Sequence, residues 1–305
     1  MKERFLAELR ALGPVLVDEP LSRHTTIGIG GPAGAYFAAR SEEQLRGALR
    51  AARGHGVPVF VLGAGSNVLV RDGGIRGLVI ENATDRVEGP EPNGAGFKVR
   101  AASGVSFAAL ARRLSFAGYS GLEWACGIPG TLGGAAVYNA GAYGRSLVDV
   151  LKRVRLVDAD NGVVEMRPEE LSLSYRTSAF TTGALQDRVV LSVDLALDKG
   201  DPNDLRARVR ELDARRLAAQ PRGRNSGSMF RNPPEHPAWW LIDQVGLRGH
   251  RIGNAQISHQ HTNFFLNLGG ATATDVLALM DLARSRVRER FGIELANEVA
   301  TVGEP

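Results

Sequence analysis

Residues 57–80 are VPVFVLGAGSNVLVRDGGIRGLVI, and the order of elements within them decides the fold. The apolar run at 57–62 predicts a buried strand, with Pro58 at its start, where a missing N–H is tolerated. The loop GAGSN (63–67) follows, and a second short run, VLV (68–70), comes directly after it. A dinucleotide-binding Rossmann motif needs a third glycine and a helix after its loop. The order strand, loop, strand therefore excludes that motif.

The same loop is a candidate for binding a phosphate group. Successive backbone N–H groups in a loop of glycine, serine and asparagine can form an anion-binding nest without a helix. A tight glycine turn with no ligand is an equally good interpretation of this loop taken alone.

The densest glycine segment is GLEWACGIPGTLGGAAVYNAGAYG at 121–144, with seven glycines and almost no charge. Because glycine lets the backbone approach a ligand closely, this segment favours wrapping against a large, partly apolar ligand. A flexible linker is the alternative, but linkers usually lack large apolar residues such as Trp124 and Leu132.

The rest of the chain predicts alternating helices and strands. Ser41 and Gln44 fit a capping box ahead of an apolar stripe, and Ser106 precedes a second such stripe. Asn161-Gly162 is a hairpin signal inside a β-rich region that ends near residue 200. Further helices are expected at 204–219, 239–245 and 274–291, and further strands at 97–101 and 263–268.

Composition places the chain among ordinary globular proteins. It has 305 residues, 44% of them hydrophobic, and one cysteine, Cys126, which excludes an internal disulfide. No apolar run is long enough to span a membrane, and the charged N-terminus lacks an apolar signal core. We therefore expect a cytoplasmic protein with no membrane insertion.

The charge balance raises nucleic-acid binding as an alternative. The net charge is +4 and the sequence pI about 9.5, mostly from arginine. These arginines alternate with acidic residues, as in DLRARVRELDARR (204–216), which is typical of a solvated helix face. We expect no nucleic-acid partner, and a basic surface also attracts phosphorylated small molecules.

Few residues have the spacing of a known catalytic motif. His259 and His261 would share one face of a strand, but no further ligand lies at metal-binding spacing, so no metal is expected. Three polar segments remain, at 173–180, 226–233 and 294–299. They contain an arginine, serines and glutamates, which suit an anion clamp with a hydroxyl proton donor. An ion pair or a turn hydrogen bond is the simpler role for each segment alone.

Seven motifs in order resemble the UDP-N-acetylenolpyruvoylglucosamine reductase (MurB) family, in its shorter, type II branch. The resemblance covers about residues 20–303. The motifs are HTTIGIGGPAGAYF (24–37), LGAGSNVLVRDGGIRGLVI (62–80), GLEWACGIPGTLGGAAVYNAGAYG (121–144), LSYRTSAF (173–180), GSMFRNPP (227–234), HQHTNFFLNLGGATATDV (259–276) and GIELANEVATVG (292–303).

The resemblance implies an α/β fold similar to vanillyl-alcohol oxidase, with two FAD-binding subdomains and a C-terminal α/β substrate domain. The expected boundaries are 1–80 joined by the tail 296–305, then 81–200, then 201–295. The expected cofactor contacts are Gly63, Ala64, Gly65, Ser66, Asn67, Gly127, Ile128, Pro129, Gly130, Thr131, Gly133, Gly134, Asn139 and Gly141. The loop at 63–67 would cradle the FAD pyrophosphate.

The resemblance also implies a reaction. NADPH would reduce the bound FAD, and hydride would then pass to the vinyl carbon of UDP-N-acetylglucosamine enolpyruvate, giving UDP-N-acetylmuramate for peptidoglycan. Ser228 matches the proton donor, while Arg176 and Glu298 match the residues that act on the substrate carboxylate. Expected substrate contacts are Tyr175, Arg231, Asn232 and His261. No obligate protein partner is implied.

Three residues depart from the family's usual motifs. Arg231 stands where lysine is usual, Ala64 where glycine is commoner, and Asn297 where proline is common. Another FAD-dependent oxidoreductase of the same fold is the alternative function, although such oxidases often hold FAD covalently through a histidine or cysteine. The segment 121–144 contains no histidine.

Overall fold

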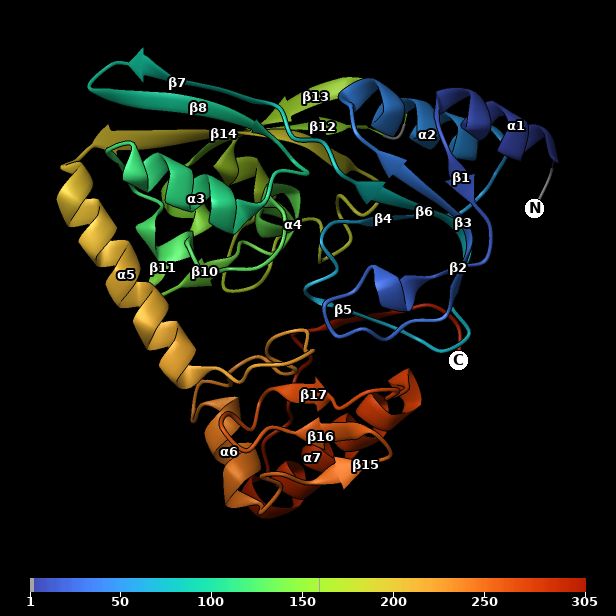
Figure 1. Cartoon of the computed structure of the whole chain (residues 1–305), viewed down its shortest axis with the longest axis vertical. Helices are drawn as coiled ribbons and strands as arrows, with labels where there is room; N and C mark the ends of the chain where they lie inside the picture. The colour runs from blue at the N-terminus through green and yellow to red at the C-terminus, as the bar shows by residue number, and fades with distance from the viewer. Residues whose placement is uncertain (1–2, 159) are drawn as a thin grey trace. The chain divides into compact units, whose positions relative to one another are not determined.

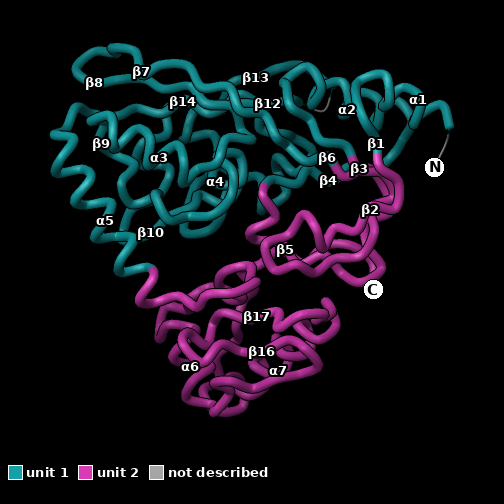
Figure 2. Tube along the Cα trace, viewed as in Figure 1, with its two compact units in different colours: residues 1–15, 37–63, 80–216 teal, residues 16–36, 64–79, 217–305 magenta. Residues whose placement is uncertain are grey.

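The computed structural model describes residues 3–158 and 160–305. The chain divides into two compact units (Figure 2). Unit 1 comprises residues 1–15, 37–63 and 80–216, and unit 2 comprises residues 16–36, 64–79 and 217–305. The division falls within a five-stranded sheet of order β1-β3-β6-β4, in which β2 also pairs with β3. Its strands are β1 (Val15–Leu16), β2 (Glu19–Pro20), β3 (Pro32–Ala39), β4 (Val59–Leu62) and β6 (Ile75–Asn82).

Unit 1 contains a six-stranded sheet of order β13-β12-β14-β8-β7 (Figure 1). The short strand β9 pairs with β14. These strands are β7 (Val87–Asn93), β8 (Gly96–Ala102), β9 (Tyr119–Ser120), β12 (Leu151–Val157), β13 (Val163–Met166) and β14 (Val189–Lys199). Its helices are α1 (Glu3–Leu12), α2 (Glu42–Gly54), α3 (Phe107–Phe116), α4 (Leu132–Val137) and α5 (Pro202–Ala219). A short hairpin, β10 (Gly141–Ala142) and β11 (Arg145–Ser146), and three 3₁₀ turns at 123–125, 147–149 and 168–171 complete it.

The two faces of the six-stranded sheet differ because side chains alternate along each strand. Val99 and Ala101 of β8 point into an apolar core that includes residues of α3 and α4. Lys98 and Arg100 alternate with these two residues along β8. They point to the other face and contact Asp194 of β14. One face is therefore a core and the other a charged surface.

Unit 2 is built around a three-stranded sheet and two helices. Its elements are a 3₁₀ turn at 21–23, β5 (Val68–Val70), α6 (Ala238–Gln244), β15 (Arg251–Ile252), β16 (Ala255–Ile257), β17 (Phe265–Asn267), α7 (Ala273–Phe291) and β18 (Ala300–Val302). The sheet has the order β15-β16-β17, and β18 pairs in parallel with β5. Ile27, Leu69 and Met229 share one buried core with α6 and α7.

The helix caps are where the sequence predicts them. Ser41 and Ser106 each accept a bond from an N–H in the first turn of α2 and α3. Gln44 does not complete the expected box, because its side chain accepts from the Arg40 N–H instead.

At α7, the Asp72 carboxylate accepts from the N–H groups of Ala273 and Thr274 at 2.8 and 3.0 Å. These bonds hold the pKa of Asp72 below its ordinary value although burial raises it.

Several predicted elements are confirmed. The order β4, loop, β5 replaces a strand–loop–helix unit, and β12 and β13 form the hairpin expected at Asn161-Gly162. The alternating histidines are different: His259 and His261 lie in the turn between β16 and β17, where His259 is exposed and His261 half-buried. The prediction that they share a strand face was wrong, because a two-residue alternation also occurs by chance in turns.

Candidate active site

Arg176, in unit 1, lies at the tip of a tight turn between Ser174 and Thr177. The Ser174 N–H donates to the Thr177 carbonyl at 3.0 Å, and the Thr177 N–H donates back at 3.2 Å. Arg176 has a φ of 53°, in the left-handed region that bulky residues avoid. Such strain persists only where surrounding contacts fix the residue, and it is enriched at functional sites.

Three side-chain bonds hold this turn against the end of the glycine-rich segment. Arg176 Nη2 donates to the Gly141 carbonyl at 2.8 Å, and Asn139 Nδ2 donates to the Ser174 carbonyl at 3.1 Å. Ser178 Oγ donates to the Val137 carbonyl. The structure therefore brings together three predicted site residues, Asn139, Gly141 and Arg176.

The middle of the glycine-rich segment is ordered rather than linker-like. Trp124 and Leu132 are buried in the core of unit 1, and residues 132–137 form α4, a helix that the sequence did not predict. Its first N–H groups are already bonded: Leu132 to the Val105 carbonyl, Gly133 to the Ser103 carbonyl, and Gly134 to Thr131 Oγ1. The N-terminus of α4 thus has no open N–H at these positions for a phosphate.

Two glycines, Gly63 and Gly134, differ in the space around them. A Cβ at Gly63 would lie 2.7 Å from Thr131 Oγ1, so the loop after β4 approaches the segment closely. At Gly134 a Cβ would meet only Thr131 Oγ1, at an ordinary 3.5 Å, and the residue is exposed. Among the described residues, nothing close to Gly134 demands glycine at this position.

Arg216, near the end of α5, is a residue that the sequence analysis missed. Its side chain lies along Gly127, where a Cβ would sit 2.6 Å from Arg216 Cδ. Burial lowers the pKa of Arg216, and the positive charge of Arg176 lowers it further, while Tyr143, Cys126 and Asp213 raise it. Within the described ranges no hydrogen bond or ion pair holds its guanidinium. A cation in this state can bind an anionic or carbonyl group of a ligand. Residues 204–216 are thus not wholly a solvated face.

Cys126, the single cysteine, is buried next to Asp213. Its Sγ is 3.5 Å from Asp213 Oδ1, and burial raises the pKa of the thiol to about 11, with Asp213 contributing. Arg112 pairs with Asp213 at 2.6 Å. A thiol with such a pKa stays protonated and unreactive, which agrees with a packing role.

Residues 64–67 of the predicted phosphate loop belong to unit 2, where backbone carbonyl groups of the loop accept hydrogen bonds. The Gly65 carbonyl accepts from the Thr26 N–H at 3.0 Å, and the Asn67 carbonyl accepts from the Ala300 N–H at 3.1 Å. Since a trans peptide places N–H opposite C=O, the Ser66 N–H points away from Thr26. This orientation suits an anion-binding nest.

Gly65 itself is required by the backbone that surrounds it. It has a φ of 62°, and a Cβ there would lie 2.1 Å from the His24 carbonyl oxygen. A side chain at Gly65 would therefore displace residues 24–25 before it reached any ligand.

Ser228 follows a turn that Asn225 shapes. Asn225 Oδ1 accepts from the Gly227 N–H at 3.0 Å, and Gly227 has a φ of 78° with open space around it. Beyond Ser228, the Met229 N–H donates to the Asn263 carbonyl at 2.9 Å. Ser228 is half-buried on a backbone fixed on both sides.

Glu298 lies on the segment next to Ser228. The Glu298 N–H donates to the Met229 carbonyl at 2.8 Å, and the Arg231 N–H donates to the Ala296 carbonyl at 2.9 Å. Asn67 Nδ2 also donates to the Glu298 carbonyl, at 3.3 Å. Asn297, the unusual residue here, accepts from Arg284 Nη2 at 2.8 Å, which anchors the segment without a proline.

The predicted substrate contacts have other structural partners as well. Asn232 Oδ1 accepts from the Ala238 N–H at 3.0 Å at the start of α6. His261 lies against the rings of Phe264 and Trp239, and burial lowers its pKa, so the imidazole is neutral at pH 7. Tyr175 is 58% exposed and lies below the Arg176 guanidinium, 5.8 Å from its ring centre.

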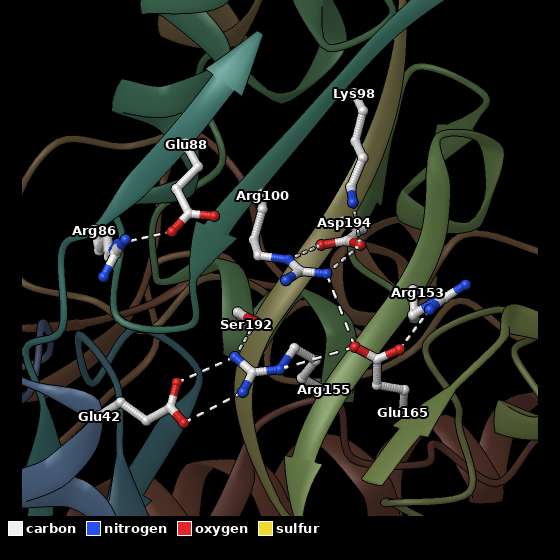
Figure 3. Close-up of polar contacts among 10 residues, drawn as sticks. All are labelled: Glu42, Arg86, Glu88, Lys98, Arg100, Arg153, Arg155, Glu165, Ser192 and Asp194. Atoms are coloured by element: carbon white, nitrogen blue, oxygen red, sulfur yellow. Dashed lines mark hydrogen bonds and ion pairs between the residues drawn. The ribbon is translucent and has the colours of Figure 1, made fainter. Parts of the chain in front are cut away.

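An open groove of about 550 Å³ lies elsewhere in unit 1, against the charged face of the sheet, and contains none of the predicted site residues. Figure 3 shows that three of its arginines are paired: Arg86 with Glu88 at 2.7 Å, Arg100 with Asp194 at 2.6 Å, and Arg155 with Glu42 at 3.1 Å. Burial raises the pKa of Asp194, but Arg100 and Lys98 outweigh it and hold the pKa below its ordinary value. Side chains that satisfy one another in this way stabilise the sheet and offer little to a ligand.

Comparison with known proteins first defines the class. An FAD binding domain model matches residues 33–167, and the fold is the mixed α/β fold of vanillyl-alcohol-oxidase-type flavoproteins. The chain is therefore an FAD-dependent oxidoreductase. No group of three or more metal-ligating side chains occurs in the described part of the chain, and no helix there has the length and apolar character of a membrane span.

The second step is the family. The model of the UDP-N-acetylenolpyruvoylglucosamine reductase C-terminal domain matches residues 219–302. A reductase of this name from Rubrobacter xylanophilus is 47% identical over 94% of this chain and 95% of its own, and one from Synechococcus is 44% identical over 96% and 93%. The crystal structure of the Thermus caldophilus reductase has a TM-score of 0.77 at 35% identity, over 94% of this chain and 98% of that one.

The chain belongs to the UDP-N-acetylenolpyruvoylglucosamine reductase family and serves peptidoglycan precursor synthesis. FAD is its cofactor and NADPH its hydride donor. The C-terminal match decides between this function and another oxidoreductase of the same fold, and the length agrees with the shorter branch.

Proposed function

We propose that Arg176, Ser228 and Glu298 carry the reduction of UDP-N-acetylglucosamine enolpyruvate to UDP-N-acetylmuramate. The observation behind this proposal is the backbone ladder in unit 2, in which Glu298 N–H bonds to the Met229 carbonyl at 2.8 Å. It sets a hydroxyl and a carboxyl group on neighbouring, rigid segments. Rigid placement of a proton donor and a charged group is what such a reaction needs from its protein.

Bound FAD would supply the redox chemistry, the transfer of hydride from NADPH to the vinyl carbon of the substrate. The residues present are compatible with that cofactor. The Gly65–Ser66 peptide presents its N–H on the side away from Thr26, suited to a pyrophosphate, and Gly134 leaves an open surface. Arg216 is a cation without a bonded partner among the described residues, suited to an anionic or carbonyl edge of the cofactor.

The side chains of the protein stabilise the negative charge that develops on the substrate and supply one proton. When hydride adds to the vinyl carbon, the carbon beside the carboxylate gains an electron pair, and Ser228 Oγ donates a proton to it. Arg176 draws negative charge onto the substrate carboxylate, and Glu298, by its match to the family motif, acts at the same group. Hydride and proton together saturate the double bond, and solvent returns a proton to Ser228.

Further parts of the proposal concern the surroundings. Tyr175, Arg231, Asn232 and His261 would contact the UDP-sugar, with Arg231 in the role usually given to lysine. NADPH and a UDP-sugar are intracellular metabolites, so we place the enzyme in the cytoplasm. The reaction requires neither nucleic acid nor a protein partner. The subdomains 1–80 with 296–305, 81–200 and 201–295 remain the proposed functional division.

Two half-reactions followed at the flavin absorption band test this proposal. The purified protein should bind FAD, be bleached by NADPH and recover colour when the enolpyruvyl substrate is added. Arg176→Ala and Glu298→Gln should be bleached at nearly the normal rate and recover colour slowly. If the purified protein takes up no FAD, the proposed function is contradicted. If the Arg176 and Glu298 variants lose only the first half-reaction, these residues act in flavin reduction by NADPH and not on the substrate.

A further inference from the structure

Thr26 joins two segments of unit 2 that are almost 200 residues apart in sequence. Its hydroxyl donates to the Asn225 carbonyl at 2.7 Å and also lies 3.3 Å from the Gly65 carbonyl. Its backbone N–H donates to the same Gly65 carbonyl at 3.0 Å. One residue thus contacts both the phosphate loop and the turn that leads to Ser228.

On the loop side, the contact sets the direction of a peptide group. With the Gly65 carbonyl held toward Thr26, the Ser66 N–H faces the opposite way, as the proposed cradle requires. The backbone N–H of Thr26 makes most of this contact, since it has the shorter distance. Replacement of the Thr26 side chain would leave that bond in place.

On the turn side, the hydroxyl is the main contact. It holds the Asn225 carbonyl at the upstream end of the turn, while the Met229–Asn263 bond holds the downstream end. Gly227, between them, has open space around it and a flexible backbone. Upstream of Asn225, the Arg224 carbonyl accepts from the Asn267 N–H at 2.9 Å. Without the Thr26 bond, the Asn225 carbonyl would lose its contact, and the turn before Ser228 would be held less firmly between Arg224 and Met229.

We propose that Thr26 is a positioning residue that aligns Ser228 with the bound cofactor by tying the proton-donor turn to the phosphate loop. The proposal rests on the functions proposed for Ser228 and for the loop. Thr26 need not touch a reacting atom. Small displacements of a catalytic group reduce the rate severely, so one hydrogen bond at this place matters more than its contribution to stability.

Thr26→Val is a clean test because the side chain is exposed and valine has nearly the same shape. We expect little change in melting temperature and in the FAD dissociation constant, since the Thr26 N–H still holds Gly65. Bleaching by NADPH should be within about twofold of normal. Recovery of colour with the enolpyruvyl substrate should slow by about tenfold, the value of one hydrogen bond in rate.

Two control variants separate positioning from structure. Thr26→Ser keeps the hydroxyl and should restore the rate of colour recovery. Thr25 is the matched neighbour: its buried hydroxyl bonds within its own turn, to the Ile29 carbonyl at 2.8 Å and the Ile29 N–H at 3.2 Å. Thr25→Val should lower the melting temperature and leave both half-reactions unchanged.

A double-mutant cycle with Ser228→Ala decides whether Thr26 acts through Ser228. In the Ser228→Ala background, Thr26→Val should cause no further slowing of the residual colour recovery. Equal slowing in both backgrounds, or a normal rate in Thr26→Val alone, would overturn the inference. Failure of the proposed function would differ, because the unsubstituted protein would then show no colour recovery at all.

Discussion

The turns that present Arg176 and Ser228 are built in opposite ways. Arg176 is itself the left-handed residue of its turn, with a φ of 53°, and side-chain bonds to Gly141 and Ser174 compensate for the strain. At Ser228 the left-handed position belongs to the preceding Gly227, with a φ of 78°, so the functional residue carries no such strain. The long cationic side chain of Arg176 is therefore presented from a strained residue. The short hydroxyl of Ser228 is presented from an unstrained residue that follows a glycine.

Ser228→Ala should give the largest effect, because this turn serves a single hydroxyl. Loss of a positioned proton donor typically costs about 10²–10⁴-fold in rate. The variant should bind FAD, be bleached by NADPH, and remain bleached when the enolpyruvyl substrate is added. Stopped-flow absorbance measures this directly, and normal colour recovery would remove Ser228 from the mechanism.

The comparison also shows what sequence can predict. Caps such as Ser41 and Ser106, the hairpin at Asn161 and the rejection of a Rossmann loop depend on neighbouring residues, so local patterns sufficed. The family motifs supplied Arg176, Ser228 and Glu298, but no residue pattern alone assigned their roles.

The contacts that sequence could not predict are long-range. Thr26 bonds to Asn225 across 199 residues, although HTTIGIGG was among the recognised motifs. Arg216 looked like one more arginine of a solvated helix, and only the structure shows its side chain on Gly127. Periodicity records which face of a helix is apolar, and it carries no signal for a single arginine turned inward.

Asp194→Asn tests whether stability and turnover are separable in unit 1, because Asp194 lies on the sheet face opposite the core. Its lowered pKa means that its contribution to folding is present above the unfolded value of 3.8 and lost as pH falls through the folded value. At pH 7 the variant should lose about 2 kcal/mol of stability, discounted for the partial exposure of Arg100.

Denaturant unfolding at several pH values measures this effect. The difference from the unsubstituted protein should shrink as pH falls from about 3.8, where Asp194 of the unfolded chain becomes protonated, through the lower pKa of the folded state. A constant difference down to pH 2 would show that packing rather than charge is responsible. Both half-reactions should be normal at pH 7, in contrast to Ser228→Ala.

Arg216→Met should weaken FAD binding by about tenfold, the loss of one charge-assisted hydrogen bond. The protein without FAD should be no less stable, since an apolar chain replaces a half-buried cation that has no bonded partner among the described residues. Titration of the apoprotein with FAD, followed by flavin fluorescence, gives the affinity. Arg215→Met is the matched control, because Arg215 lies over the Tyr143 ring and near Glu211, and it should bind FAD normally.

A mirrored pair of substitutions tests the comparison of the two turns itself. Arg176→Gly and Arg176→Ala lose the same contacts, but only glycine relieves the left-handed strain, so the glycine variant should be more stable by about 1 kcal/mol. Gly227→Ala should be less stable than the unsubstituted protein by about the same amount, without a clash. Thermal unfolding measures both, and equal stability of the two Arg176 variants would show that the turn is not strained.

Ser226→Ala should have the smallest effect, although Ser226 lies only two residues from Ser228. Ser226 is 2% exposed, and its hydroxyl has no hydrogen-bond partner among the described residues. A ligand cannot reach an oxygen that water cannot reach, so the hydroxyl takes no part in the reaction in this conformation. Because burial of an unsatisfied hydroxyl costs about 1–3 kcal/mol, alanine should leave stability unchanged or raise it. Both half-reactions should run at normal rates, and a severe defect in colour recovery would transfer the proton-donor role from Ser228 to Ser226.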